Sequence, residues 1–232
     1  MGNIFTLDNI QKIKKDQILV FGTDMEGSHV GGIGRIAVDK FGASIGNSEG
    51  MQGKSYAIPV LNGNKKISKN KLYDNLERFY FYAMDHPYKE FILTDIGTWA
   101  GYDTNYMAYM TYLMHFPVNV IIPKEFSQIK GYKLFNQDLK CDEGFVLEEG
   151  KDYEIEDTGE VEYMFFFEAH PLNLISYIKH NKTSRIYEVT GSGHLFVDMA
   201  DDGTVYCNKL HIGKELDIRN VDDIIKKFSY YK

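Results

Sequence analysis

The sequence has few cysteines, few prolines and one tryptophan. Its 232 residues include two cysteines, Cys141 and Cys207, so it contains neither a disulfide framework nor a Cys-x-x-Cys metal motif. No metal site is expected on this ground. Two cysteines without a framework are typical of a protein of the reducing cytosol, and we predict a cytoplasmic location.

A surplus of positive charge is also missing. The 26 Lys and Arg residues are outnumbered by 33 Asp and Glu residues, which gives a formal net charge of −7. Because a sequence-independent grip on nucleic acid needs clustered Lys and Arg, broad nucleic-acid binding is not expected. No signal peptide and no run of about 18 apolar residues occurs, so neither secretion nor insertion into a membrane is indicated.

The sequence does contain two glycine-rich turns, each of which follows a short apolar run. The first glycine turn comprises residues 22–34 and the second comprises residues 95–102. Glycine lets backbone N–H groups approach an anion without an intervening Cβ, and a helix that starts after the turn adds the positive end of its dipole. Two such turns predict a phosphate-binding site.

The first half of the chain alternates short apolar runs with helix-spaced apolar residues. Such alternation predicts a mostly parallel sheet with helices on both faces. Ser68 is a predicted N-cap of the second helix. The predicted strands cover residues 18–21, 55–60, 91–94 and 118–122, and the predicted helices cover residues 33–41, 72–83 and 106–114.

Both glycine turns directly follow predicted strands. In open parallel sheets, ligands bind in the crevice outside the carboxyl ends of the strands, so the two turns are expected on the same rim. A glycine turn after a strand is often only a tight connection, but two of them on one rim favour a ligand site.

Two commoner phosphate motifs do not fit. Gly53-Lys54-Ser55 ends like a P-loop, but Ser48 stands where the first glycine is required, and a strand-like run follows instead of a helix. A dinucleotide fingerprint needs its glycines immediately after the strand. Here Gly32-Ile33-Gly34 comes only after residues 23–31, and Ala37 replaces the last glycine.

Four blocks follow one another in the first half. They are Phe21-Gly22-Thr23-Asp24, then Gly31-Gly32-Ile33-Gly34 with Phe41-Gly42-Ala43, then Gly50 to Pro59, then Thr94-Asp95-Ile96-Gly97 with Ala100-Gly101-Tyr102. In this order they resemble the small macrodomain-like non-structural proteins of phages and prophages, over about residues 15–123. The resemblance implies a macrodomain-like, three-layer α/β/α domain over residues 1–128 that binds an ADP-ribose-like or NAD-derived nucleotide.

The resemblance also implies roles for individual residues. Asp24 would lie near the distal ribose, where its carboxylate accepts hydroxyl hydrogen bonds or acts as a catalytic base on water. Trp99 either packs on the ligand or fills a gap beside the loop, His29 is either a phosphate partner or a solvated loop residue, and Asp8 would read adenine. The implied ligand-binding residues are Gly22, Thr23, Asp24, Gly31, Gly32, Gly34, Gly97, Thr98, Trp99, Ala100, Gly101 and Tyr102.

The second half changes to short β-like runs, which predict a smaller, strand-rich α+β domain over residues 129–232. Helices are predicted near residues 171–178 and 222–228. Gly131 to Phe135, Phe166 to Leu172 and Lys209 to Ile212 are similar to an uncharacterised domain that recurs in phage proteins. Cys141 matches that domain and is interpreted as a buried structural cysteine. The predicted strands cover residues 132–135, 151–155, 161–167, 185–189, 194–197, 204–207 and 209–212.

Three functional classes follow. The first is a module that captures an ADP-ribose-like or NAD-derived nucleotide to counter host signalling or modification, with no additional cofactor. The second is an ADP-ribosyl hydrolase that uses Asp24. The third is an interaction protein with a ligand-free macro-like fold, and a protein partner through the second domain is compatible with each class.

Overall fold

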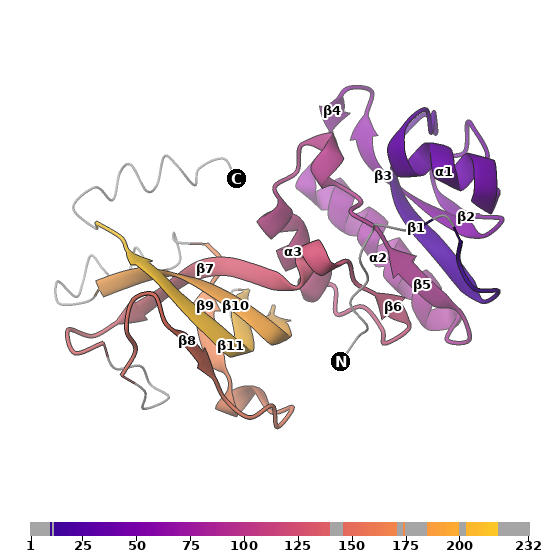
Figure 1. The fold of residues 1–232 in the computed structure, drawn as a ribbon. Coiled ribbons are helices and arrows are strands. Elements are labelled where there is room, and N and C mark those ends of the chain that lie inside the picture. Colours follow the sequence, from indigo (N-terminus) through magenta and orange to yellow (C-terminus); the bar gives the residue numbers. More distant parts are fainter. Residues whose placement is uncertain are drawn as a thin grey trace. The chain divides into compact units, whose positions relative to one another are not determined.

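A computed structural model describes residues 10, 12–139, 146–170, 174, 185–199 and 203–217. The chain divides into two compact units, Met1–Ser127 and Gln128–Lys232, one residue before the predicted boundary. The first unit is mixed α/β, and the second contains an antiparallel sheet (Figure 1). In the described part of the chain, no helix is both long enough and apolar enough to cross a membrane.

The sheet of the first unit has the strand order β2-β3-β1-β5-β6, and β4 pairs with the end of β3. Strands β3, β1, β5 and β6 are parallel, whereas β2 and β4 are antiparallel to β3. The sheet is therefore mixed around a parallel centre. The strands are β1 (Gln17–Asp24), β2 (Gly50–Gln52), β3 (Ser55–Asn62), β4 (Lys65–Lys66), β5 (Glu90–Leu93) and β6 (Val120–Ile121).

Helix α1 (Gly32–Phe41) packs against one face of the central strands. Ala37 and Phe41 form a buried cluster with Leu19, Phe21 and Ala57. Phe21 and Ala57 are partners in the β1–β3 register, so they share a face. Burial of this cluster fixes which face of α1 meets the sheet.

Helix α2 (Lys69–Asp85) packs against the opposite face. Phe79 of α2 lies 5.0 Å from the ring of Tyr56 and 5.5 Å from the ring of Phe91, measured between centroids. Tyr56 is the neighbour of Ala57 along β3, so its side chain points to the other side of the sheet. The two helices thus cover both faces of the sheet.

Side chains cap two of the helices that the structure describes, α2 and α3 (Thr104–Leu113). Ser68 caps α2 by accepting the N–H of Lys71, as the sequence predicts, and Asp103 caps α3 by accepting the N–H of Tyr106. Helix α1 follows Gly31, which has no side chain to offer. The first helix therefore begins without a side-chain cap.

The strands of the second unit pair into a closed ring. β7 pairs with β10, β10 with β11, β11 with β9, and β9 returns to β7 through Glu168 and Tyr132. β8 extends the sheet from β11. The strands are β7 (Gln128–Phe135), β8 (Asp152–Glu154), β9 (Phe165–Glu168), β10 (Arg185–Asp198) and β11 (Thr204–Glu215).

Two glycines make room for the side chain of Phe167 inside the closed ring of strands. A Cβ on Gly131 of β7 or on Gly191 of β10 would lie 2.5 Å or 2.4 Å from the nearest Phe167 ring atom. The aromatic ring thus occupies the space of two missing side chains. This close packing explains why strand-breaking glycines stand inside long strands.

Several sequence predictions need correction. Val161–Tyr163, predicted as the start of a strand over residues 161–167, form a 3-10 helix, η4. The four short strands predicted between residues 185 and 212 are two long ones, β10 and β11. Other predictions fall outside the described residues: the helix near residues 222–228, Asp8 and Cys141. Of the helix predicted near residues 171–178, the structure describes only Leu174, which is helical.

Candidate functional site

A cavity of about 440 Å³ lies at the carboxyl ends of β1 and β5 in the first unit. Both glycine turns contribute to it, and they lie side by side as parallel strands require. From the predicted site, the first turn supplies Gly22, Thr23, Asp24, Gly31, Gly32 and Gly34, and the second supplies Trp99. The lining is completed by His29, for which the sequence suggests a phosphate contact, and by Val30, Ile33, Thr94 and Asp95.

The N-terminus of α1 opens onto this cavity. The first hydrogen bond into the helix is donated by the N–H of Arg35 to the carbonyl of Gly31, at 3.3 Å, so the preceding N–H groups have no partner inside the helix. A Cβ at Gly31 or Gly32 would meet no atom within 4 Å. The first turn of α1 carries no acidic residue that would offset the positive end of the helix dipole.

Asp24 is engaged by its own turn. Its carboxylate accepts the N–H of Glu26 at 2.9 Å, the N–H of Ser28 at 3.1 Å and the hydroxyl of Ser28. Burial raises the pKa of Asp24, but the hydrogen bonds from Ser28, Glu26 and Gly27 outweigh burial and hold the pKa below its ordinary value. Such a carboxylate is a weak base, and its visible role is to shape the first glycine turn.

Asp95 holds the second glycine turn in the same way. Its carboxylate accepts the N–H of Thr98 at 3.0 Å, the N–H of Gly97 at 3.4 Å and the hydroxyl of Thr98. The N–H groups of Ala100, Gly101 and Tyr102 are donated to carbonyls of Gly97 and Thr98, within and beside the 3-10 helix η2 (Thr98–Ala100). Most of the N–H groups of this turn are therefore already used.

Gly22 brings the two turns together. A Cβ on Gly22 would lie 2.0 Å from the carbonyl oxygen of Ile96, so only glycine lets the second turn cross β1 at this point. Gly97 faces the thioether of Met107, 2.9 Å from an added Cβ. Both glycines act through backbone packing, and Gly97, Thr98, Ala100 and Gly101 do not line the cavity.

His29 is buried, unlike a solvated loop residue. Nε2 of His29 lies 3.0 Å from the carbonyl oxygen of Asn47 and therefore donates a hydrogen bond to it. In the neutral imidazole, Nδ1 then accepts a hydrogen bond from the hydroxyl of Thr23, whose oxygen is 2.9 Å from Nδ1. The ring also packs edge-on against Phe21. With both nitrogens engaged, His29 supports the floor of the cavity, and its left-handed backbone (φ 49°) is the price of that position.

The apolar wall of the cavity contains Trp99. This tryptophan is 54% exposed, and Val30, 83% exposed, lines the same cavity. Tyr102, in contrast, is buried, and its hydroxyl donates to the carbonyl of Ile67 at 3.0 Å. Burial raises the pKa of Tyr102 above its ordinary value. Tyr102 therefore stabilises the second turn from below and does not line the cavity.

The described ranges contain no group of three or more His, Cys, Asp and Glu side chains placed to hold a metal ion. The cavity also has no Lys or Arg in its lining, and its charged members are the carboxylates of Asp24 and Asp95. An anion in this cavity would therefore depend on backbone N–H groups.

Comparisons with known proteins bear on the second unit. Residues 129–224 match the family model of a domain of unknown function, DUF7666. An uncharacterised domain is what the sequence predicts for this half. The searches of curated proteins and of solved structures returned no significant match.

Proposed function

We propose that the first unit binds an ADP-ribose-like or NAD-derived nucleotide in the cavity between the two glycine turns. The observation that carries the proposal is that one cavity combines the open N-terminus of α1 with an exposed tryptophan. Backbone N–H groups suit a phosphate, and the indole of Trp99 suits a nucleobase or a ribose. Its volume of about 440 Å³ is in the range of small-molecule sites.

The charges favour one orientation of the ligand. Phosphate lies at Gly31 and Gly32, because the N–H groups of the second turn are used and the carboxylates of Asp24 and Asp95 repel an anion. Sugar hydroxyls lie toward the carboxylates, which accept hydrogen bonds. The ligand is thus held mainly by the first glycine turn, instead of being clasped equally by both.

Binding without turnover is the function that these contacts support best. The hydrogen bonds that lower the pKa of Asp24 weaken it as a base. Helices on both faces of a sheet with a parallel centre support a macrodomain-like, three-layer unit. In this proposal the chain is a cytoplasmic phage or prophage protein that captures a nucleotide and so counters host ADP-ribose or NAD-based signalling.

Calorimetric titration with ADP-ribose, NAD and cyclic ADP-ribose isomers tests the proposal. Heat of binding and quenching of Trp99 fluorescence with at least one of them are expected. Gly31→Glu should weaken binding about tenfold or more, since it places a carboxylate where the phosphate is proposed. The backbone of Gly31 is extended and a Cβ there meets nothing, so the variant should fold.

Val118→Glu is the matched control. Val118 is 99% exposed and precedes β6, at the amino ends of the parallel strands, so the same added charge lies on the opposite rim. The control should bind like the original chain. If none of the nucleotides gives heat of binding, the proposal is overturned, and the class that remains is an interaction protein with a ligand-free macro-like fold.

A further inference from the structure

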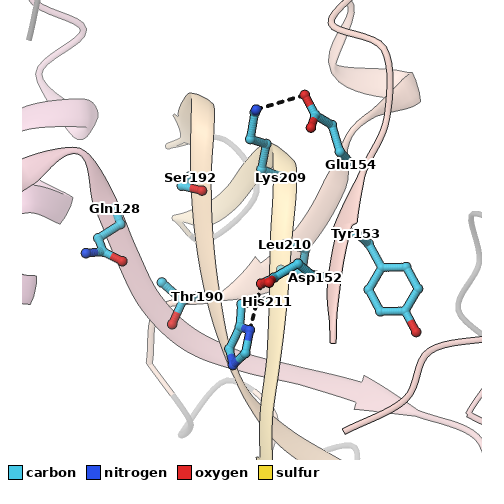
Figure 2. A pocket seen from close by; sticks show the side chains of 9 residues that line it. All are labelled: Gln128, Asp152, Tyr153, Glu154, Thr190, Ser192, Lys209, Leu210 and His211. Atoms are coloured by element: carbon cyan, nitrogen blue, oxygen red, sulfur yellow. Dashed lines mark hydrogen bonds and ion pairs between the residues drawn. The ribbon is translucent and has the colours of Figure 1, made fainter. Parts of the chain in front are cut away.

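A second hollow, of about 520 Å³, lies on the sheet of the second unit (Figure 2). It is independent of the nucleotide cavity. The strand register builds it from two rows of directly opposed residues. We call this surface the polar hollow; its rows are Gln128, Ser192, Lys209 and Glu154, then Thr190, His211 and Asp152.

Both rows lie on the side of the sheet that faces away from the buried core. Gly191 and Leu210, which separate the rows along β10 and β11, are buried, whereas Lys209 and His211 are exposed. Because neighbouring side chains of a strand alternate between its faces, the rows project outward together. The two rows therefore give this face mostly side chains that form hydrogen bonds.

One wall of the polar hollow consists of a hydrogen-bonded His–Asp pair and a Lys–Glu ion pair. Nδ1 of His211 lies 2.8 Å from the carboxylate of Asp152, and Nζ of Lys209 lies 2.8 Å from that of Glu154. Figure 2 shows that the second ring nitrogen of His211 points away from Asp152. Each carboxylate keeps lone pairs beyond the one it shares, so this wall offers both donors and acceptors.

The other wall consists of neutral polar side chains. Within the described parts of the chain, the side chains of Gln128, Thr190 and Ser192 form no hydrogen bond. An amide and two hydroxyls each donate and accept. The polar hollow thus combines three neutral polar side chains that are open to a ligand with a hydrogen-bonded His–Asp pair and a Lys–Glu ion pair.

We propose that the polar hollow binds a saccharide. Lys209 is neutralised by Glu154, and Asp152 is matched to His211, so the hollow has no cationic cluster to hold a phosphate or a nucleic acid. Leu210 and Tyr153 also line the hollow, but Leu210 is the one aliphatic residue in this lining, so the hollow offers no continuous apolar floor for a lipid. Vicinal sugar hydroxyls donate and accept at close spacing, which is the pattern that both walls present.

Nuclear magnetic resonance with the full-length, isotope-labelled chain tests this. Maltotriose, cellotriose and triacetylchitotriose, each at millimolar concentration, are added in turn, with inorganic phosphate as the anionic probe. At least one saccharide should shift the amide signals of β10 and β11 and the ring signals of His211. Phosphate should leave those signals unchanged.

A double variant and a matched control locate the binding. Thr190→Val with Ser192→Ala removes two hydroxyls and should weaken saccharide binding about tenfold, because each lost hydrogen bond to a neutral group lowers affinity several-fold. Glu148→Ala breaks the exposed Glu148–Lys151 pair, 2.7 Å long and outside the polar hollow, and should leave affinity unchanged.

The two outcomes that overturn the proposal are distinct. One is the absence of shifts in β10, β11 and His211 with all three saccharides. The other is a response of the same signals to phosphate and not to sugars, which would make the polar hollow an anion site. Unaltered amide spectra of both variants without ligand show that they are folded.

Discussion

The two glycine turns of the first unit are built alike at their start and differ at their end. Each follows a parallel strand, and each begins with an aspartate that accepts backbone N–H groups and one hydroxyl of its own turn. After the first turn comes the ten-residue helix α1, and after Asp95 comes the three-residue η2. The first turn leaves N–H groups open, whereas the second consumes most of them.

The comparison shows that glycine content alone does not make an anion site. In the second turn, Gly97 allows close packing against the side chain of Met107, and Gly101 ends the 3-10 helix η2 in the left-handed conformation, with φ +86°. In the first turn, Gly31 and Gly32 lie open at a helix N-terminus. Backbone N–H groups remain available to an anion where a regular helix starts directly after the turn without a side-chain cap.

The largest expected effect comes from the residue that joins the two turns. Gly22→Ala should lower the free energy of unfolding of the first unit by about 3 kcal/mol or more, because the added Cβ would lie 2.0 Å from a backbone carbonyl that side-chain motion cannot relieve. Urea unfolding followed by Trp99 fluorescence measures this, since the chain has one tryptophan and it belongs to the first unit.

Gly31→Ala is the control for Gly22→Ala. It adds the same methyl group in open space and on extended backbone, so no clash arises, and the weaker N-cap preference of alanine should cost at most about 1 kcal/mol. Equal losses in both variants would contradict the view that Gly22 is required by the crossing of the second turn.

A smaller effect is expected at the second turn when its aspartate is removed. Asp95→Ala leaves the N–H and hydroxyl of Thr98 without their acceptor and should cost about 1–2 kcal/mol of stability. Nucleotide affinity should not fall, because a carboxylate that repels phosphate is also removed. Unfolding and calorimetry on the same sample separate the two effects.

Asp103→Ala provides a comparison for Asp95→Ala. Asp103 also accepts a backbone N–H, that of Tyr106 at 3.0 Å, but it does not line the cavity. It should lose similar stability with no change in affinity. A marked loss of affinity in Asp95→Ala alone would mean that the second turn holds the ligand after all.

Much of the first unit can be predicted from the sequence because its signals are local. The helix-spaced residues 72–83 and the cap Ser68 correspond to α2, and the apolar run after Lys15 corresponds to β1. The strands β2 and β4 have two or three residues and no apolar pattern, so sequence periodicity could not reveal them.

The second unit shows where local signals fail. Residues 191–193, Gly-Ser-Gly, predict a break between two strands, but β10 continues through a register shift between Ser192 and Leu195. The need for space beside Phe167 explains Gly191, and that need arises from β9, which is distant in sequence. A glycine required by tertiary packing cannot be distinguished from a turn glycine by its neighbours alone.

The site has the same division between local and tertiary information. Its rim follows from strand–turn order, which is why residues 22–24, 31, 32, 34 and 99 of the prediction meet in one cavity. The burial of His29 and of Tyr102 depends on hydrogen-bond partners in other segments of the chain, such as Asn47 and Ile67. These partners lie in other elements, beyond the reach of a pattern.

A modest effect on affinity is expected from the aromatic residues of the second turn. Trp99→Ala should weaken nucleotide binding about fivefold to tenfold, because the indole lines the cavity. Tyr102→Phe removes a hydroxyl that donates to the carbonyl of Ile67, so it should lower stability by about 1 kcal/mol and leave affinity unchanged. Calorimetry measures affinity in both variants. A loss of affinity in Tyr102→Phe with unchanged affinity in Trp99→Ala would place the ligand against Tyr102.

The smallest expected effect is a pH dependence that arises in the first turn. Because hydrogen bonds hold the folded-state pKa of Asp24 below its ordinary value of 3.8, its carboxylate stabilises the fold fully above that value and less as pH falls through the folded pKa. Asp24→Asn lacks this titration, so its stability difference from the original chain should shrink between pH 6 and about pH 3. Ser28→Ala removes the hydroxyl donor, which should raise the pKa of Asp24 toward its ordinary value, so that the loss of stability on acidification is smaller and is complete at higher pH. Urea midpoints from Trp99 fluorescence across this range measure both shifts, and a difference that stays constant with pH would show that the turn does not depend on the charge of Asp24.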